Sequence, residues 1–243
     1  MGWDVTYHPF APTEVRGIYF RALRDEAFRE QLYGEFAVHG SDAERLASIF
    51  EEAATYVAED HFTKYHGFAM ASVAGFLRRY WYIRGSAFTF LVEEDPLYFR
   101  YVTDWRSLIP DEFVTEDFRG IICENYCGGV FLGPEGLRAL KVDYERDEQV
   151  RKDMDKLFSH GRLPVFWKAV DYALENGLGL IEATDVLVPN PFAYDQSQCY
   201  SQALHCETEG VVLYGKAIVE QAREAECIEH ARKKGFWAGL FRR

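Results

Sequence analysis

The sequence lacks the motifs that usually announce an enzyme. It has no G-x-S-x-G nucleophile motif and no P-loop, and its Gly-Leu-Gly at 177–179 precedes an apolar run, whereas a dinucleotide-binding fingerprint follows a strand. Asp and Glu are so frequent that any two could be offered as an acid–base pair. The sequence therefore points to no catalytic residue and no cofactor, which gives mild support to a binding protein.

The sequence has no long hydrophobic run, and we expect no signal peptide. Its longest apolar stretch, about 68–77, is too short to cross a bilayer and is followed by Arg78 and Arg79. The N-terminus has no basic region before an apolar one, and no Asn stands in an Asn-x-Ser/Thr context. Five cysteines, an odd number without repeated spacing, are typical of reduced thiols. We expect a cytoplasmic protein that does not bind membranes.

Positive charge is scarce overall. The 243 residues carry a formal net charge of −12, with 48% hydrophobic and 16% aromatic residues. Such a surface repels nucleic-acid phosphates and suits either solubility or a basic protein partner. Residues 91–117 hold eight acids against two arginines, whereas 229–243 hold five bases against one acid. We expect that basic, aromatic tail to be docked or frayed.

The local patterns predict an α+β fold, predominantly helical with a small mixed or antiparallel sheet. Residues 1–243 are expected to form a single globular domain, or two tightly packed lobes that meet near 115–120. Alternation at Trp3, Val5 and Tyr7 predicts a strand ended by Pro9 and Pro12. Further strands are expected at 87–92, at 121–132 around a Gly128-Gly129 turn, and after Gly177.

Helices are predicted from apolar residues at 3.6-residue spacing over 12–23, 26–36, 41–57, 67–77, 134–158, 164–175 and 208–225. Ser41 and Glu44 have the spacing of a capping box. Gly67, Ala71, Ala74 and Gly75 would let another backbone approach closely. Asn176-Gly177 is typical of a left-handed helix cap.

Cysteine and histidine offer a weak metal signal. Cys123, Cys127, Cys199, His205 and Cys206 could supply zinc ligands, but their spacing is loose and Cys is also a common core residue. His61 and His66 are five residues apart and lack the glutamate of an H-E-x-x-H helix, so we interpret them as surface or cap residues. We therefore predict no metal site.

A long polar segment at 188–206 stands between the last predicted strand and helix. Loops of this length in compact domains are usually functional or disordered, and its aromatic residues and cysteines argue against disorder. Because Cys199 and Cys206 have no evident base or metal partner, we interpret the loop as an ordered cover over the C-terminal strand.

Several segments resemble a proteobacterial family of uncharacterised proteins found beside type VI secretion and polymorphic toxin genes. The resemblance runs almost end to end through 1–9, 75–85, 124–132, 158–191 and 199–201. Members are regarded as candidate immunity proteins, so the resemblance implies a cytoplasmic binder that neutralises a cognate effector. It implies no functional residues.

The leading hypothesis is an immunity protein that occludes the active site of a toxin domain through a basic surface of that partner. The partner-binding candidates are Glu93, Glu94, Asp95, Asp104, Asp111, Glu112, Asp143, Glu145, Asp147 and Glu148. The alternative is a hydrolase that reverses the toxin's modification or removes its product, with Asp185, Asp195 and Cys199 in the 184–206 loop. A housekeeping domain is the third possibility.

Overall fold

The structure is a computed structural model that describes residues 3–56, 61–62, 64–114, 116, 121–122 and 129–240. Its centre is a five-stranded sheet in the order β5-β6-β1-β3-β9. The strands are β5 (Phe131–Leu132), β6 (Gly179–Thr184), β1 (Val5–Phe10), β3 (Tyr80–Tyr82) and β9 (Cys206–Glu207). All neighbours are antiparallel except β3 and β9. The sheet is therefore mixed, as predicted.

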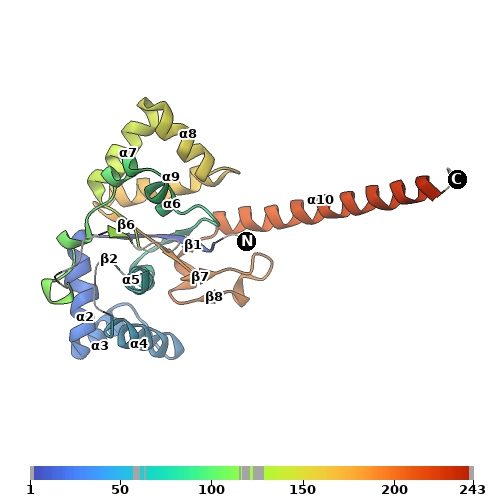
Figure 1. Ribbon diagram of the computed structural model, residues 1–243. Helices are drawn as coiled ribbons and strands as arrows, with labels where there is room; N and C mark the ends of the chain where they lie inside the picture. Colours follow the sequence, from blue (N-terminus) through green and yellow to red (C-terminus); the bar gives the residue numbers. More distant parts are fainter. Residues whose placement is uncertain are drawn as a thin grey trace.

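Helices cover both faces of this sheet (Figure 1). One face carries α6 (Thr89–Glu94), η2 (Pro96–Tyr101), α7 (Pro134–Arg146), α8 (Glu148–Leu157) and α9 (Arg162–Glu175). The other carries α1 (Pro12–Glu14), η1 (Val15–Phe20), α2 (Arg21–Arg24), α3 (Glu26–Glu35), α4 (Ser41–Ala53) and α5 (Lys64–Leu77). The fold is α+β and predominantly helical, as predicted.

The central strand β1 is buried along its whole length because both faces are covered. Val5 and Tyr7 pack in the core under α9, whereas Phe10 packs in the core under α5. The sheet takes β1 and β3 from before residues 115–120, and β5, β6 and β9 from after them. The lobe boundary considered from the sequence falls mostly outside the described residues.

Most helices follow the predicted apolar faces. Val15, Tyr19, Ala22 and Leu23 are buried across α1, η1 and α2, which follow one another without a break. In α4 the buried residues are Leu46, Ile49, Phe50 and Ala53; Val57 lies outside the described residues. Gly177 adopts the left-handed conformation predicted for it, with φ of 69°.

Three local predictions are wrong. The segment predicted as a strand at 87–92 is mostly helix α6, whose first amides contact the buried side chain of Glu182. The predicted long helix over 134–158 divides at Asp147, because that carboxylate accepts from the backbone N–H groups of Gln149 and Val150 and starts α8. Ser41 is inside α4 and Gly40 is its N-cap, so the capping box does not form.

Pro9 does not end the first strand. β1 continues through Pro9 to Phe10, pairing with β6 at Leu180 and Gly179. On its other side β1 pairs with β3 only at Thr6 and Tyr7. At Pro9 the strand thus has a neighbour on one side only, where a missing N–H is tolerated.

The segment 188–206 is an ordered loop. β7 (Leu187–Val188) and β8 (Gln198–Cys199) pair antiparallel, and two turns, η5 (Tyr194–Gln196) and η6 (Ala203–His205), lie on either side of β8. Ser201 Oγ donates to the Ser72 carbonyl of α5 at 2.7 Å. Beneath the loop Tyr80, Tyr82 and Leu187 form a small core. The loop packs on Leu187, at the end of the strand predicted after Gly177, and on Tyr80 and Tyr82 of β3.

We predict that Gly75→Ala will loosen this loop. A Cβ atom at Gly75 would lie 2.3 Å from Ser201 Oγ and 3.1 Å from the Tyr80 ring. The overlap should lower the free energy of unfolding by roughly 1–3 kcal/mol, as overpacking does. Chemical denaturation measures the effect. Gly34→Ala in α3 is the matched control, because no atom lies within 4 Å of its added Cβ. An unchanged stability for Gly75→Ala would contradict the close packing.

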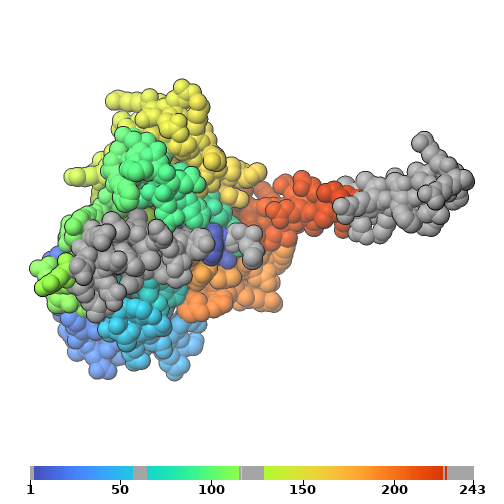
Figure 2. Space-filling view, in the orientation of Figure 1, coloured from blue at the N-terminus to red at the C-terminus, as the bar shows by residue number. Residues whose placement is uncertain are grey.

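The last helix, α10 (Glu209–Leu240), is longer than the predicted 208–225. Its first turns pack on the body, and the rest extends away from it, with the C-terminus far from the sheet (Figure 1). The described atoms of its middle part likewise stand clear of the body (Figure 2). Whether the basic tail is docked concerns side chains at 229–243 that lie outside the described ones.

Candidate functional site

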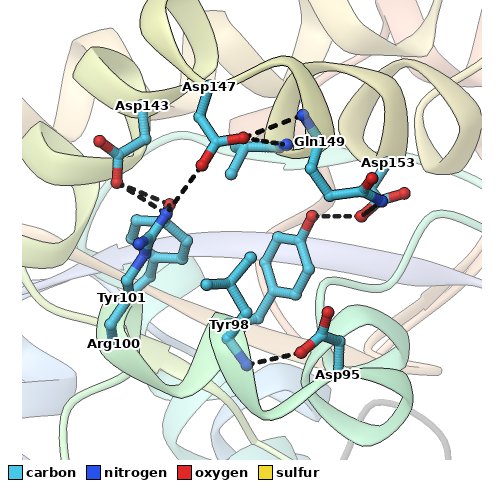
Figure 3. A network of polar contacts seen from close by, with 10 residues as sticks. Asp95, Tyr98, Arg100, Tyr101, Asp143, Asp147, Gln149 and Asp153 are labelled. Carbon is cyan, nitrogen blue, oxygen red and sulfur yellow. Dashed lines mark hydrogen bonds and ion pairs between the residues drawn. The ribbon is translucent and has the colours of Figure 1, made fainter.

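The two acidic segments favoured as binding sites meet on one surface. η2 packs against α7, which brings the residues after Glu93 beside the Asp143–Glu148 patch. Side chains of η2 form hydrogen bonds and an ion pair with side chains of α7 and α8 (Figure 3). We call this surface, formed by η2, α7 and α8 together with the end of α6 that leads into η2, the acidic face.

Arg100 is at the centre of the contacts. Its Nη2 lies 3.0 Å from Asp143 Oδ2 and 3.8 Å from Asp147 Oδ2, and it donates to the Tyr101 hydroxyl at 2.6 Å. Tyr101 in turn donates to Asp143 at 2.8 Å. Burial, followed by the hydrogen bond to Asp143, raises the pKa of Tyr101 to about 12. One cation thus holds two carboxylates and a phenol in fixed positions (Figure 3).

A second set of contacts extends the network to α8. The Tyr98 hydroxyl donates to Asp153 Oδ2 at 2.7 Å, and Gln149 Nε2 donates to the same oxygen at 2.9 Å (Figure 3). Asp95 accepts from the Leu97 N–H at 2.8 Å and so starts η2. Both tyrosine rings are buried in the core under the face. The acidic face is therefore anchored from below.

The candidate acids of this face differ in role. Asp95 and Asp147 are caps, Asp143 is paired with Arg100, and Glu148 lies 2.8 Å from Lys152. Glu93, Glu94 and Glu145 are exposed. Residues 93–101 and 134–157 together hold ten acids and seven bases, a balance of −3. The face is thus moderately acidic, and much of its charge serves the fold.

The remaining candidates lie elsewhere. The chain crosses to the other face of the sheet after η2, where Trp105, Leu108 and Ile109 enter the core under α5. Asp104 pairs with Arg106 at 2.6 Å and caps the turn η3 (Trp105–Ser107). Asp111 and Glu112 begin η4 (Asp111–Phe113), and Glu112 pairs with Arg24 of α2. The acidic stretch 93–117 is therefore not one surface.

A large apolar side chain is exposed within the acidic face. Phe99 is 46% exposed and stands in η2 between Tyr98 and Arg100, the two residues that tie η2 to α7 and α8. Val142 of α7 is 44% exposed. Exposed apolar groups rimmed by polar ones are typical of protein-binding surfaces. Sequence reasoning named the acids and missed Phe99, because nothing in its spacing separates it from core aromatics.

The loop at 188–206 borders a groove of about 430 Å³, lined by Asp42, Arg45 and residues 197–203. Arg45 donates to the Cys199 carbonyl at 2.5 Å, which joins α4 to the loop. Two large apolar side chains project from the loop: Phe192 is 67% exposed and Leu204 is 87% exposed. This is the second surface that could take a protein partner.

The hydrolase alternative needs an activated group in this loop. The Cys199 thiol contacts the Tyr80 hydroxyl at 3.5 Å and donates to the Ser201 carbonyl at 3.2 Å. Burial raises the pKa of Cys199 and that of Cys206, the latter to about 12. A nucleophilic cysteine needs the opposite shift. Asp185 and Asp195 are both exposed in turns. The loop therefore offers no activated thiol.

The sequence offered Cys123, Cys127, Cys199, His205 and Cys206 as possible metal ligands. Among the described residues no group of three or more His, Cys, Asp or Glu could hold a metal ion. His205 Nδ1 lies 2.9 Å from the Gly75 carbonyl. Cys123 and Cys127 lie outside the described residues.

His66 corrects the expectation of a surface histidine. It is buried, with Nδ1 2.7 Å from the Tyr19 hydroxyl and Nε2 3.1 Å from the Tyr56 carbonyl. Burial lowers its pKa to about 4, although the bond to Tyr56 opposes the shift. The side chain of His61 lies outside the described ones.

The most unusual buried group went unnoticed in the sequence. Glu182 lies in β6, in a run that reads as apolar, and is fully buried. Its carboxylate accepts from the N–H groups of Phe88 and Thr89 and from the hydroxyls of Thr89 and Tyr7. Burial raises the pKa of Glu182 to about 7, although these four donors oppose the shift. The residue joins β6, β1 and α6, and we assign it to the fold.

Neither a protein-family model, nor a curated protein, nor a solved structure matches this chain. Among the described residues, the helices include none that is both long enough and apolar enough to cross a membrane. Function must therefore be argued from the surfaces themselves.

Proposed function

We propose that the protein is an immunity protein that binds a cognate effector toxin and occludes its active site. The observation that carries the proposal is the acidic face, where η2 with the exposed Phe99 is joined to the acidic patch of α7 and α8. The resemblance of the sequence to proteins encoded beside toxin genes supports the same function. Under this proposal the protein acts in the cytoplasm.

The network around Arg100 suits a binding surface. Binding loses less affinity when side chains are already held in place, because little conformational entropy remains to be lost. Tyr98, Tyr101 and Arg100 fix η2 on α7 and α8 through bonds of 2.6–3.0 Å. Phe99 is thereby presented from a short, anchored turn. An aromatic anchor of this kind inside a polar rim is the usual arrangement of a binding hot spot.

The exposed carboxylates define the partner. Glu93, Glu94 and Glu145 would favour a basic surface and would accelerate its association. Toxin domains that act on nucleotides or nucleic acids have basic active sites, because their substrates are anionic. Carboxylates placed over such a site would both mimic the substrate charge and exclude it.

The first test is a binding measurement with the toxin encoded beside this gene. We expect a 1:1 complex, and Phe99→Ala should weaken it roughly 30-fold, the effect of losing a hot-spot side chain. The paired change Glu93→Lys and Glu94→Lys should slow association and reduce its dependence on salt. Asp95 and Asp147 are left unchanged because they cap η2 and α8.

The matched control is Phe192→Ala, which removes a more exposed ring from the 188–206 loop. It should leave the affinity unchanged. If Phe192→Ala weakens the complex and Phe99→Ala does not, the loop is the binding surface. Absence of any complex at micromolar concentration would refute the proposal, and protection of a target by substoichiometric protein would indicate an enzyme instead.

A further inference from the structure

The groove beside the 188–206 loop is lined mostly by polar side chains. Its nine lining residues come from α4 and from the segment 197–203, and seven of them carry nitrogen or oxygen in the side chain. Its volume of about 430 Å³ is in the usual range of small-molecule sites, most of which are lined mainly by apolar groups. A groove of this size with a polar lining therefore points to a polar ligand.

The two charges among the lining residues cancel. Asp42 Oδ1 lies 3.3 Å from Arg45 Nη1, and the same nitrogen donates to the Cys199 carbonyl at 2.5 Å. An anionic ligand would be repelled by the Asp42 carboxylate, and a cationic ligand would be repelled by the Arg45 guanidinium. The groove therefore favours a neutral ligand.

The outer edge of β8 is already occupied by Arg45. The Tyr200 N–H donates to the Val186 carbonyl at 2.8 Å, so positions 198 and 200 form their backbone hydrogen bonds with β7. In an antiparallel pair the residue between them, Cys199, directs its carbonyl away from β7. An extended peptide would need that carbonyl to add a strand, but it accepts from Arg45. The groove is therefore poorly suited to an extended peptide.

The amide side chains of the groove suit sugar hydroxyl groups, which both donate and accept hydrogen bonds. Gln198 Nε2 donates to the Tyr200 hydroxyl at 2.5 Å, and Gln202 Oε1 accepts from the Leu204 N–H at 3.5 Å. Within the part of the chain that the structure describes, the Gln198 carbonyl oxygen and the Gln202 amide nitrogen have no hydrogen-bond partner. One acceptor and one donor thus remain for a ligand.

The Tyr200 ring supplies an apolar surface beside these amides. It is half-buried and meets the Phe68 ring edge-on, with the ring centroids 5.3 Å apart. The carbons of a sugar ring present C–H groups, which pack on an aromatic ring as other apolar groups do. The groove thus combines hydrogen-bonding groups with an aromatic ring in a fixed position.

The groove is formed before any ligand enters. Arg45 joins α4 to the loop, and Ser201 Oγ donates to the Ser72 carbonyl of α5 at 2.7 Å. Because these walls are already ordered, little conformational entropy would be lost on binding.

We propose that this groove binds a neutral saccharide of one or two rings. Gln198 and Gln202 form hydrogen bonds with its hydroxyl groups, and Tyr200 packs on its C–H face. α4 and the acidic face lie on opposite faces of the sheet, so the site is separate from the proposed toxin-binding surface. The saccharide site does not depend on toxin binding.

NMR titration of the isotope-labelled full chain tests the saccharide site, with maltose, cellobiose, lactose and chitobiose as probes. We expect at least one of them to bind 1:1 with a dissociation constant of about 1 mM. Gln198→Ala should weaken that binding roughly fivefold, the effect of losing one hydrogen bond. Gln196→Ala is the matched control and should bind as wild type does, because Gln196 is exposed in the same loop but does not line the groove.

The charge of the ligand is tested separately. The affinity for the bound disaccharide should be the same at low and high salt, because salt screens charges and a neutral sugar carries none. Glucosamine or glucuronate binding more tightly than glucose would show that the groove selects a charged ligand, and would overturn the proposal.

The disaccharide titrations can overturn the proposal as well. Absence of binding by all four in the millimolar range would do so, and so would equal binding by the Gln198→Ala and Gln196→Ala variants. Binding of tetra-alanine in place of every sugar would assign the groove to a peptide instead. Retained far-UV circular dichroism in each variant shows that the chain remains folded.

Discussion

Replacing Glu182 with alanine will lower the free energy of unfolding by roughly 4 kcal/mol, the scale of leaving two buried donors without a partner and opening a cavity beside them. The carboxylate is fully buried and accepts from four donors: two backbone N–H groups at Phe88 and Thr89 and two hydroxyls at Thr89 and Tyr7. Alanine removes the acceptor of the Thr89 N–H and hydroxyl groups, whereas the Tyr7 hydroxyl keeps the Ser86 carbonyl at 2.7 Å and the Phe88 N–H keeps the Tyr7 hydroxyl at 3.0 Å. It also leaves a cavity between β6 and α6.

The geometry explains why the loss should exceed that of an ordinary buried acid. Thr89 Oγ1 lies 2.5 Å from Glu182 Oε1, and the Tyr7 hydroxyl lies 2.9 Å from Oε2. Tyr7 is in the central strand and Thr89 is in the first turn of α6. One side chain therefore fixes a strand, its neighbour and a helix, and its removal should affect the packing of all three.

Chemical denaturation followed by circular dichroism measures the change. Glu182→Gln keeps the size of the side chain and one acceptor oxygen, but its NH2 group faces hydrogen-bond donors. It should therefore lower the free energy of unfolding by less than Glu182→Ala does. Glu145→Ala, an exposed acid of α7, is the control and should stay within about 0.5 kcal/mol of wild type. A Glu182→Ala protein as stable as the control would show that the donors find other partners.

The sequence was sufficient where one physical signal dominated. The apolar spacing of 41–53 and of 164–175 predicts α4 and α9 with their buried faces, because periodicity decides which side of a helix meets the core. Gly75 was expected to allow close approach, and Ser201 and Tyr80 occupy the space that a side chain would fill. Gly177 likewise takes the left-handed conformation predicted for it.

Predictions from the sequence were wrong where tertiary contacts determine the secondary structure. Residues 87–92 are rich in strand-forming side chains, yet Thr89–Glu94 is helical because its N-terminal amides meet Glu182, 93 residues away along the chain. Asp147 looked like one acid in a charged patch, and its side chain instead ends one helix and starts the next. From the sequence alone, acids that cap a helix, form an ion pair or are buried cannot be distinguished from acids that only add charge to the surface.

For the candidate site, too, the sequence predicted one part and could not predict another. The sequence identified the acidic segments that form part of the acidic face, since charge density is visible in composition. It could not show that 93–101 meets α7 while 111–113 meets α2, because that depends on where the chain crosses the sheet. Nor could it single out Phe99 among nineteen phenylalanines, since exposure is a property of the fold.

Lowering the pH from 6.5 to 5 will remove about 4 kcal/mol of stability through two buried histidines, at 1.36 kcal/mol per pKa unit. Burial lowers the pKa of His8 to about 3 and that of His66 to about 4. Below pH 6.5 both histidines become protonated in the unfolded chain but stay neutral in the folded protein, so protons stabilise the unfolded state. Their contribution is therefore present above pH 6.5 and is lost as the pH falls toward 4 and 3.

Glu182 acts in the opposite direction over part of this range. Because the folded state holds its pKa near 7, its contribution is complete below the unfolded pKa of about 4.5 and is lost as the pH rises through 7. Acidification from pH 7 to 5 thus regains some stability at Glu182 while it is lost at His8 and His66. We expect a shallow decline to about pH 5 and a steeper one below, where the gain at Glu182 is complete and no longer offsets the loss at the histidines.

His8→Phe separates the histidine effect from general acid sensitivity. The His8 ring is stacked on Tyr80 with centroids 4.5 Å apart, and its two nitrogens have no hydrogen-bond partner among the described residues. Phenylalanine keeps the stacking and cannot titrate, so the loss at His66 is then offset by the gain at Glu182, and little net decline should remain between pH 6.5 and 5. His39→Gln changes an exposed histidine and should leave the profile unchanged. Denaturation midpoints measured across pH 4–8 decide the matter: if His8→Phe and wild type decline in parallel, His8 does not govern the acid response, and its burial carries no penalty on protonation.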